Sequence, residues 1–310
     1  MLNQIKGFTG LPWIKQWLTA GVMENHSWSP TTAGTPQGGI ISPLLANIAL
    51  HGMEKILGVK FNSVGYLLSG CAVVVRYADD FVVFHHTKEG CEDAKHKLQL
   101  WLAQRGLQFS EHKTHIRHLT QGFDFLGFNI RHYPVKNRKQ PYIFLAKPAK
   151  SSIQHFRQQI KQAWKQAQNL PIQQVINFIN PKLRGWAYYF RIGAAKETFA
   201  LLDHWCWIRQ ERFVAKRHPN KNWKWRIAQY WGTIPERKDR WVFQDKTTGA
   251  HLLKLAWVPI KRHILVKGNA SPDDPTLQDY WHRRKRQKGT HKQIGIKAET
   301  ASRLLEPNAG

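Results

Sequence analysis

Apolar residues in the first part of the chain recur at three- and four-residue steps, which is typical of amphipathic helices. This spacing predicts helices in three segments: residues 10–20, 42–57 and 88–105. Gly21 and Gly106 suit the ends of the first and third helices. Ser42 as N-cap and Pro43 at the first helical position suit the start of the second. Its expected buried stripe consists of Leu44, Leu45, Ile48, Met53, Ile56 and Leu57.

Two short apolar runs between these helices predict strands. Residues 71–75 and 81–84 are apolar and mostly β-branched or aromatic, so each run is expected to form a largely buried strand. The intervening residues 77–80 would form the turn of a hairpin, and further short strands are expected around 107–118 and 123–131. Helices and strands in this order predict an α+β fold, in which an antiparallel sheet carries helices on one face.

The pattern becomes helical after residue 150. Helical spacing covers residues 151–232, whereas residues 134–150 are rich in Pro, Lys, Asn and Arg and are expected to join two domains. Residues 233–310 are predicted to form a basic, loop-rich tail that is poorly ordered from Arg283 onward. The chain therefore divides into an α+β domain at 1–133, the joint, a helical domain and the tail.

Positive charge is concentrated in the second part of the chain. The 310 residues have a net charge of +27, but residues 1–130 hold 11 Lys and Arg against 9 Asp and Glu. Residues 131–310 hold 36 against 11. A membrane surface could also attract such charge, but that mode usually needs one amphipathic helix, and here the charge is spread over the whole segment. Nucleic acid is therefore the expected partner.

The three cysteines, Cys71, Cys91 and Cys206, have no paired spacing, which argues against a disulfide framework and a zinc knuckle. The sequence has no run of 18 apolar residues, and its N-terminus lacks the apolar core of a signal peptide. We therefore expect a soluble cytoplasmic protein with no membrane partner.

The predicted hairpin places two adjacent carboxylates, Asp79 and Asp80, at one tip. Two like charges repel each other, and a hard divalent cation with oxygen ligands relieves that repulsion. A solvent-exposed Asp-rich turn that binds no metal is the alternative.

Three further features lie at suggestive distances from this hairpin. Gly38 and Gly39, beside Gln37, allow a ligand to approach the backbone closely. Lys113 follows the predicted end of a helix, and residues 122–128 form an aromatic ribbon with a glycine at its bend. Each feature alone is also common in proteins without any special function.

In this order the motifs resemble the palm of a reverse transcriptase, specifically that of a group II intron-encoded protein. Residues 35–38 (Thr35, Pro36, Gln37, Gly38) resemble the family's nucleotide- and template-positioning loop, which Gly39 follows. Tyr77 to Asp80 resemble its metal-binding hairpin, and Lys113 falls where the family has a lysine near the triphosphate. The ribbon of Phe125, Leu126, Gly127 and Phe128 resembles the primer-holding element.

The resemblance extends to residues 182–190, which are similar to the hallmark of the family's maturase or thumb domain. Cations for phosphates and aromatic faces for unstacked bases suit RNA binding, and the expected RNA-binding cations are Arg184, Arg191, Arg212, Lys216 and Arg217. For Trp205 and Trp207 we expect packing in the helical core instead.

The resemblance implies a partial right-hand palm followed by a helical thumb. It also implies RNA-directed DNA synthesis with two Mg²⁺ ions, an RNA template, a DNA primer and dNTPs, together with intron RNA binding that assists splicing. Asp79 would contact both metals, with Asp80 in a supporting role and Tyr77 bracing the primer or nucleotide sugar.

The sequence also departs from the family pattern. Upstream of Gly34 the one acidic residue is Glu24, so we expect a truncated or split chain that lacks the upstream catalytic aspartate. Polymerase activity would then require an N-terminal fragment in trans. The tail lacks the paired cysteines of an HNH nuclease. A non-catalytic RNA-binding maturase fragment and an inactive gene remnant stay open as alternatives, so whether the chain is an enzyme by itself is uncertain.

Overall fold

The computed structural model describes residues 2–289 except 25, 31–40, 63–64, 137–140, 235–236, 238, 265 and 269. The chain forms two compact units: a first unit of Met1–Ile116 with Val266–Gly310, and a second unit of Arg117–Leu265. Both contain helices and small antiparallel sheets, so the predicted mixture of helix and antiparallel strand is confirmed.

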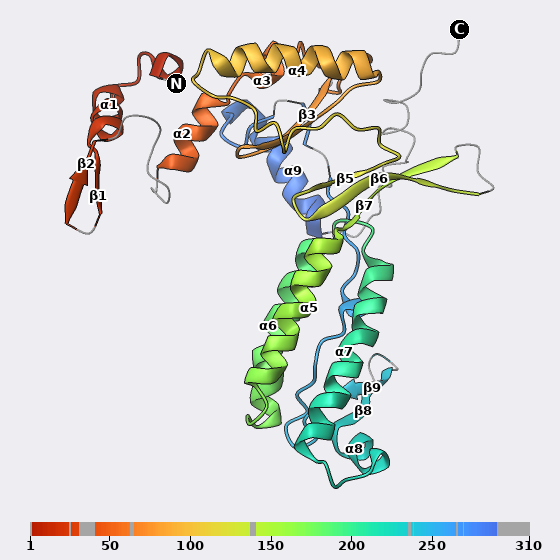
Figure 1. Ribbon diagram of the computed structural model, residues 1–310. Coiled ribbons are helices and arrows are strands. Elements are labelled where there is room, and N and C mark those ends of the chain that lie inside the picture. Colours follow the sequence, from red (N-terminus) through yellow and green to blue (C-terminus); the bar gives the residue numbers. More distant parts are fainter. Residues whose placement is uncertain are drawn as a thin grey trace. The chain divides into compact units, whose positions relative to one another are not determined.

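The first unit contains two hairpins and several helices (Figure 1). In chain order its elements are η1 (Leu2–Ile5), α1 (Leu11–Thr19), β1 (Val22–Glu24), β2 (Ser27–Ser29), α2 (Ser42–Ala49), α3 (Met53–Ile56), β3 (Val73–Tyr77), β4 (Asp80–Phe84), α4 (Lys88–Ala103), η4 (Pro275–Leu277) and α9 (Gln278–Gly289). Thr87 caps α4 by accepting a hydrogen bond from the Gly90 N–H at 3.1 Å.

The core of the first unit lies between α4, α3 and one face of the β3–β4 hairpin. Its buried side chains are Leu50, Met53, Leu98, Trp101 and Leu102. Arg105 joins the end of α4 to the end of α2, because its Nε donates to the Ala49 carbonyl at 3.2 Å. The same guanidinium lies 3.8 Å from the centre of the Trp101 ring. This packing holds the hairpin on a rigid base.

The predicted helix at residues 42–57 is interrupted. It breaks after Leu50, where Gly52 adopts a left-handed φ of 95°, so α2 and α3 are separate. Of the six residues in the predicted buried stripe, Leu44 is 58% exposed and Ile56 is 40% exposed. Ile41, not Ser42, occupies the N-cap position, and its side chain accepts no capping hydrogen bond.

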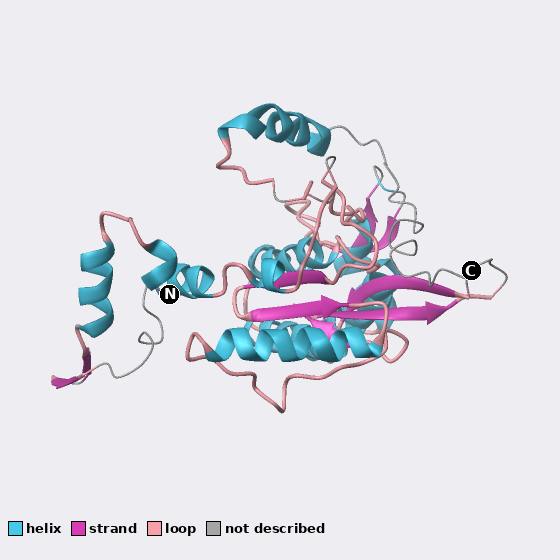
Figure 2. Ribbon diagram, turned by 90° about the horizontal axis from the view of Figure 1, so that it is seen from above, coloured by secondary structure: helices cyan, strands magenta, loops and turns pink. Residues whose placement is uncertain are grey.

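The second unit is built on three long helices and a three-stranded sheet. Its elements are β5 (Phe123–Phe125), β6 (Phe128–Pro134), β7 (Tyr142–Pro148), α5 (Lys150–Gln166), α6 (Ile172–Phe190), α7 (Lys196–Arg217), α8 (Trp223–Tyr230), β8 (Trp231–Ile234), β9 (Asp239–Phe243) and η3 (Leu255–Trp257). Figure 2 shows β6 and β7 as the two long strands lying side by side. The helical core includes Phe156, Ile160, Ile176, Phe199 and Leu202, each at most 1% exposed.

Three other predictions differ from the structure. Residues 107–118 form no strand; a turn at Glu111–Lys113 follows α4, with the Lys113 N–H donating to the Ser110 carbonyl at 3.0 Å. The predicted joint at 134–150 contains β7, which pairs with β6 along its whole length. The predicted disordered tail begins inside α9, which continues to Gly289.

Asp203 of α7 anchors the segment that follows β9. Its two carboxylate oxygens accept the N–H groups of Leu255 and Ala256 at 2.7 and 2.8 Å. Burial raises the pKa of Asp203 to about 6, although these two donors oppose the shift. The folded state therefore binds the Asp203 proton more tightly than the unfolded chain does.

We expect this carboxyl to make stability depend on pH. Its contribution is fully present below the ordinary pKa of 3.8 and is lost as the pH rises through about 6. The loss is on the order of 2–3 kcal/mol of unfolding free energy. Urea unfolding between pH 4 and about pH 7 measures it, and Asp203→Asn should flatten the profile. Glu197 on the same helix is 76% exposed, so Glu197→Gln should leave the profile unchanged; an equal change in both variants would contradict the assignment.

Candidate functional site

The acidic pair lies at the tip of the β3–β4 hairpin. Tyr77 pairs with Asp80, so Ala78 and Asp79 form a two-residue turn, narrower than the predicted turn of four. Ala78 has a φ of 54°, whereas Asp79 has no positive φ, which is the pattern of a type II′ turn. Alanine is strained in this conformation, since its Cβ disfavours the left-handed region.

Arg76 holds this strained turn in place. Its Nη1 donates to the Ala78 carbonyl and to Asn47 Oδ1 of α2, both at 2.8 Å. One guanidinium thus fixes the turn conformation and ties the hairpin tip to a helix. The result is a pair of carboxylates at a rigid, solvent-exposed position.

The hairpin has one packed and one open face. Val74, Phe81 and Val83 pack against the core of the first unit. Because side chains alternate along strands and paired residues share a face, Tyr77 and Asp80 lie on the other face. There Val75 is 44% exposed and Tyr77 66% exposed, so the strands are half-buried, not largely buried as predicted.

The donor set at the tip suits magnesium. Mg²⁺ commonly binds one or two carboxylates and retains waters or substrate phosphates as its other ligands. Asp79 and Asp80 are exposed, and the described residues contain no group of three or more His, Cys, Asp or Glu side chains placed to hold a metal. The tip could therefore bind Mg²⁺ only together with ligands beyond these two side chains.

The remaining predicted nucleotide-binding residues are only partly placed. The loop of Thr35, Pro36, Gln37, Gly38 and Gly39 lies outside the described residues. Lys113 is exposed at the end of the Glu111–Lys113 turn. Among the described residues, no hydrogen bond or ion pair joins Lys113 to Asp79 or Asp80.

The aromatic ribbon belongs to the second unit and contacts its helices. Leu126 and Gly127 have φ values of 49° and 75°, the two positive values of a type I′ hairpin turn. The Ala149 N–H and Ser152 Oγ donate to the Gly127 carbonyl at 2.8 and 3.0 Å. Tyr189 Oη donates to the Leu126 carbonyl at 2.9 Å. The two motifs singled out separately in the sequence, the ribbon and residues 182–190, are therefore in direct contact.

Phe125 and Phe128 flank this turn as a strand pair. Phe128 is buried, with ring centroids 5.7 Å from Tyr189 and 4.9 Å from Phe190. Asp124 accepts a hydrogen bond from Asn129 Nδ2 at 2.7 Å across the strands.

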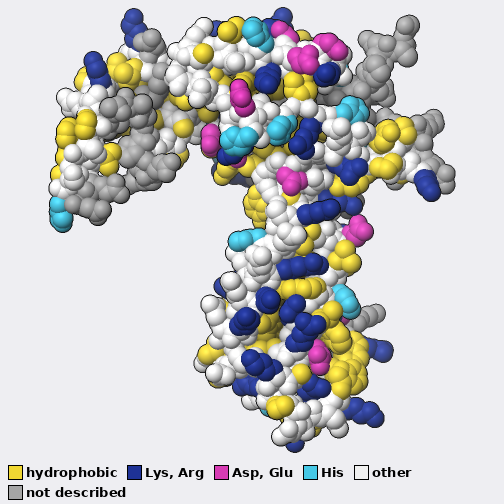
Figure 3. Space-filling model, viewed as in Figure 1, with side chains coloured by type: hydrophobic (Ala, Val, Ile, Leu, Met, Phe, Trp, Pro, Cys, Tyr) yellow, Lys and Arg dark blue, Asp and Glu magenta, His cyan; other side chains and the backbone are white. Residues whose placement is uncertain are grey.

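The predicted RNA-binding cations have different environments. Arg184, Arg212 and Lys216 are exposed, whereas Arg191 is half-buried and stacks over Tyr188 at 4.6 Å. Arg217 donates from Nη1 to the Leu170 carbonyl at 2.7 Å, so it also stabilises the loop after α5. Lys216 and Arg217 line an open polar pocket of about 420 Å³ with Gln168 and Asn169. Figure 3 shows Lys and Arg side chains gathered over these helices.

The cations singled out in the sequence do not include those of α5. Arg157, Lys161 and Lys165 repeat at four-residue steps and are all exposed, so they form one basic stripe. The ring of half-buried Trp205 contacts two guanidinium groups: that of Arg157 lies 5.7 Å from the ring centroid and that of Arg209 lies 5.0 Å from it. The four-residue repeat of Arg157, Lys161 and Lys165 could have indicated this basic stripe from the sequence alone. The second unit holds 28 Lys and Arg against 7 Asp and Glu, a net of +21.

Two protein families match the chain. Reverse transcriptase (RNA-dependent DNA polymerase) matches residues 2–130, and the group II intron maturase-specific domain matches residues 153–231. The first match contains the acidic hairpin and the ribbon, and the second contains α6, α7 and α8.

Three curated proteins illustrate the likeness. Group II intron-encoded protein LtrA of Lactococcus lactis subsp. cremoris is 32% identical, over 38% of this chain and 29% of its own length. The putative COX1/OXI3 intron 2 protein of Saccharomyces cerevisiae is 26% identical, over 46% and 22%. An uncharacterized 91 kDa protein in the cob intron of Schizosaccharomyces pombe is 24% identical, over 64% and 33%. The chain thus spans a third or less of the length of these relatives.

The helices of the described residues include none that is both long enough and apolar enough to span a membrane.

Proposed function

Because the chain belongs to the group II intron reverse transcriptase and maturase family, we propose that it binds a group II intron RNA and takes part in RNA-templated DNA synthesis. The observation that supports this most strongly is the order of its parts. An acidic, open-faced hairpin lies within the reverse transcriptase match, and the helical unit that follows it, with a net charge of +21, contains the maturase match.

In this proposal the first unit contributes groups for nucleotidyl transfer. The carboxylates of Asp79 and Asp80 hold Mg²⁺, which when bound stabilises the attacking and leaving oxygens of an in-line displacement. Tyr77 shares the open face with Asp80 and braces the sugar of the primer or the incoming dNTP. By resemblance, Lys113 and the loop at 35–39 contact the triphosphate and the template.

The second unit contributes RNA binding and primer positioning. The exposed Arg184, Arg212 and Lys216 pair with phosphates, because cations without a fixed protein partner gain most from neutralising a polyanion. By resemblance to the family, we assign primer holding to the turn at Leu126 and Gly127. Its three hydrogen bonds from α5, α6 and the segment between β7 and α5 support this role, since they fix the turn.

A second candidate is a maturase that binds intron RNA and catalyses nothing. Most of the net charge lies in the second unit, which favours RNA binding whether or not the acidic hairpin is active. Mg²⁺-dependent primer extension on an RNA template distinguishes the two candidates.

A splicing assay tests the proposed binding of a group II intron RNA. The full chain is added to a group II intron precursor RNA at a Mg²⁺ concentration too low for self-splicing. We expect splicing to accelerate, because bound cations offset phosphate repulsion in the folded RNA. Arg184→Gln combined with Arg212→Gln should weaken the effect, and exposed Lys55→Gln in the first unit serves as the matched control. No acceleration, with equal binding to an intron-free transcript of the same length, would contradict the proposal.

A further inference from the structure

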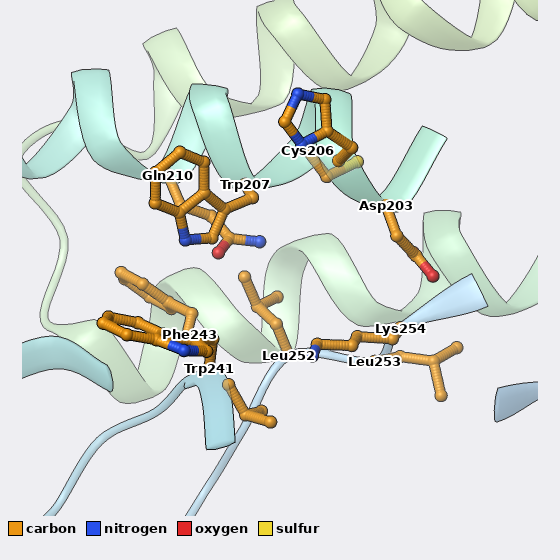
Figure 4. Close-up of a pocket in the computed structure, with 11 residues that line it drawn as sticks. Asp203, Cys206, Trp207, Gln210, Trp241, Phe243, Leu252, Leu253 and Lys254 are labelled. Carbon is orange, nitrogen blue, oxygen red and sulfur yellow. The ribbon is translucent and has the colours of Figure 1, made fainter. Parts of the chain in front are cut away.

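A small cavity in the second unit lies between α7, β9 and residues 252–254. Its volume is about 180 Å³, and Asp203, Trp207, Gln210, Trp241 and Phe243 are among the residues that line it. Figure 4 shows Trp207 and Gln210 pointing from α7 toward Phe243, Leu252 and Trp241. All of these residues belong to one unit, so the cavity is a feature of that unit alone.

Exposed aromatic rings continue from the mouth of this cavity. Trp241 is 46% exposed, and its ring centroid lies 6.2 Å from that of Trp223, which is 47% exposed, at an interplanar angle of 33°. On the α7 side, His204 stacks on Trp207 with centroids 6.4 Å apart and an angle of 13°. Flat rings thus lie both along the wall of the cavity and outside it.

The Gln210 amide is a polar group in the cavity that is available to a ligand. Asp203 already accepts two backbone N–H groups, and Lys254 forms an ion pair with Asp239 at 2.6 Å. By contrast, within the described residues the Gln210 side chain makes no hydrogen bond. An amide offers both a donor and an acceptor, as the edge of a nucleobase does.

Size and charge select among the possible occupants. A cavity of about 150 Å³ is known to take benzene, so this one has room for one planar heterocycle. Lys224 directly follows Trp223 in sequence, and Arg240 directly precedes Trp241. Both cations are exposed and can pair with phosphates. The net charge of +21 opposes binding of a basic partner and favours a nucleic acid.

We propose that this cavity takes the base of an unpaired nucleotide in an otherwise paired RNA, with Trp207 and Trp241 as stacking faces and the Gln210 amide at the base edge. Trp223 stacks the neighbouring base. The inference rests on the proposed function, because it specifies which feature of an RNA the second unit binds.

The test compares three hairpin RNAs of equal length: one with a single-nucleotide bulge, one with an abasic bulge and one fully paired. The full chain is expected to bind the base-containing bulge about tenfold more tightly than the abasic bulge, since stacking of a base on an aromatic ring has this magnitude. Combined Trp223→Ala and Trp241→Ala should abolish this difference while leaving affinity for the paired RNA unchanged. Both side chains are nearly half exposed, so folding should survive, which circular dichroism checks.

Two further variants sharpen the result. Gln210→Leu keeps the size of the side chain and removes its hydrogen bonds, so affinity for the base-containing bulge should fall about fivefold. Trp17 of the first unit is 57% exposed, and Trp17→Ala should change none of the affinities.

The outcomes distinguish this inference from the proposed function. If wild-type affinity falls steeply with salt but is the same for all three RNAs, the cavity proposal is overturned and RNA binding stands. If the wild-type chain shows no salt-dependent affinity for any of the three RNAs, both the cavity proposal and the proposed function are overturned. Loss of affinity for all three RNAs in the tryptophan variant would also overturn the cavity proposal, because it would indicate a general contact.

Discussion

Replacing Asp79 by Asn is expected to lower Mg²⁺-dependent primer extension on an RNA template by at least about a hundredfold, where each factor of ten corresponds to about 1.4 kcal/mol of barrier. The amide has nearly the shape of the carboxylate but lacks its charge, so the turn should keep its conformation. Asp80→Asn should have a smaller effect, because in our proposal Asp79 contacts both metals and Asp80 has only a supporting role.

The comparison of Asp79→Asn with the wild type requires a wild-type protein that extends a primer. It also requires a control variant in which another exposed aspartate is replaced by Asn. Asp93 is an exposed carboxylate of α4 that pairs with Lys97 at 2.6 Å, so Asp93→Asn removes one negative charge away from the hairpin. Its extension rate should equal that of the wild type. Equal rates for Asp79→Asn and Asp93→Asn would show that the hairpin is not the metal-binding element.

Raising the salt concentration from about 50 to 200 mM is expected to weaken binding of the full chain to RNA by on the order of a thousandfold. The reason is counterion release: each phosphate neutralised by a Lys or Arg frees a condensed cation, and added salt opposes that release. About six phosphate contacts suffice for this effect. The exposed cations of α5, α6 and α7 exceed that number: Lys150, Arg157, Lys161, Lys165, Lys182, Arg184, Lys196, Arg212 and Lys216.

A charge variant shows which cations make these contacts. Arg184→Gln, Arg212→Gln and Lys216→Gln together should reduce the log–log salt slope by about 2 to 3, since each contact contributes about 0.7–0.9. The matched control replaces three exposed lysines of the first unit, Lys55, Lys60 and Lys95, by Gln. A larger change of slope in the control than in the variant would place the RNA-binding surface in the first unit.

Local patterns predicted several elements correctly. The apolar runs at 71–75 and 81–84 gave the β3–β4 hairpin, and the helical spacing after residue 150 gave α5, α6 and α7. These signals depend on neighbours a few residues apart, so no tertiary information is needed. The core packing expected for Trp205 and Trp207 was also confirmed, because both pack against the helical core while half-buried.

The errors arise where distant contacts or backbone conformation decide the structure. β7 was predicted as part of a joint because its Lys and Pro content suggests a linker, yet pairing with β6 makes it a strand. The helix at 42–57 breaks because Gly52 takes a left-handed conformation, which its apolar spacing could not indicate.

The candidate site residues came from sequence motifs and stay predictions, whereas the contacts around them are seen only in the structure. The acidic pair and the ribbon were found from their motifs, whereas the supporting role of Arg76 depends on Asn47, 29 residues away in sequence. Likewise, the unbonded amide of Gln210 becomes meaningful only once β9 and residues 252–254 close the cavity around it.

The anchoring of the Leu126–Gly127 turn has a mechanical consequence. Both carbonyls of the turn accept hydrogen bonds from Ala149, Ser152 and Tyr189. The tip of the β5–β6 ribbon is therefore expected to move together with the adjoining ends of α5 and α6. A load that tilts these helices, such as a docked RNA, must displace the tip by the same rotation.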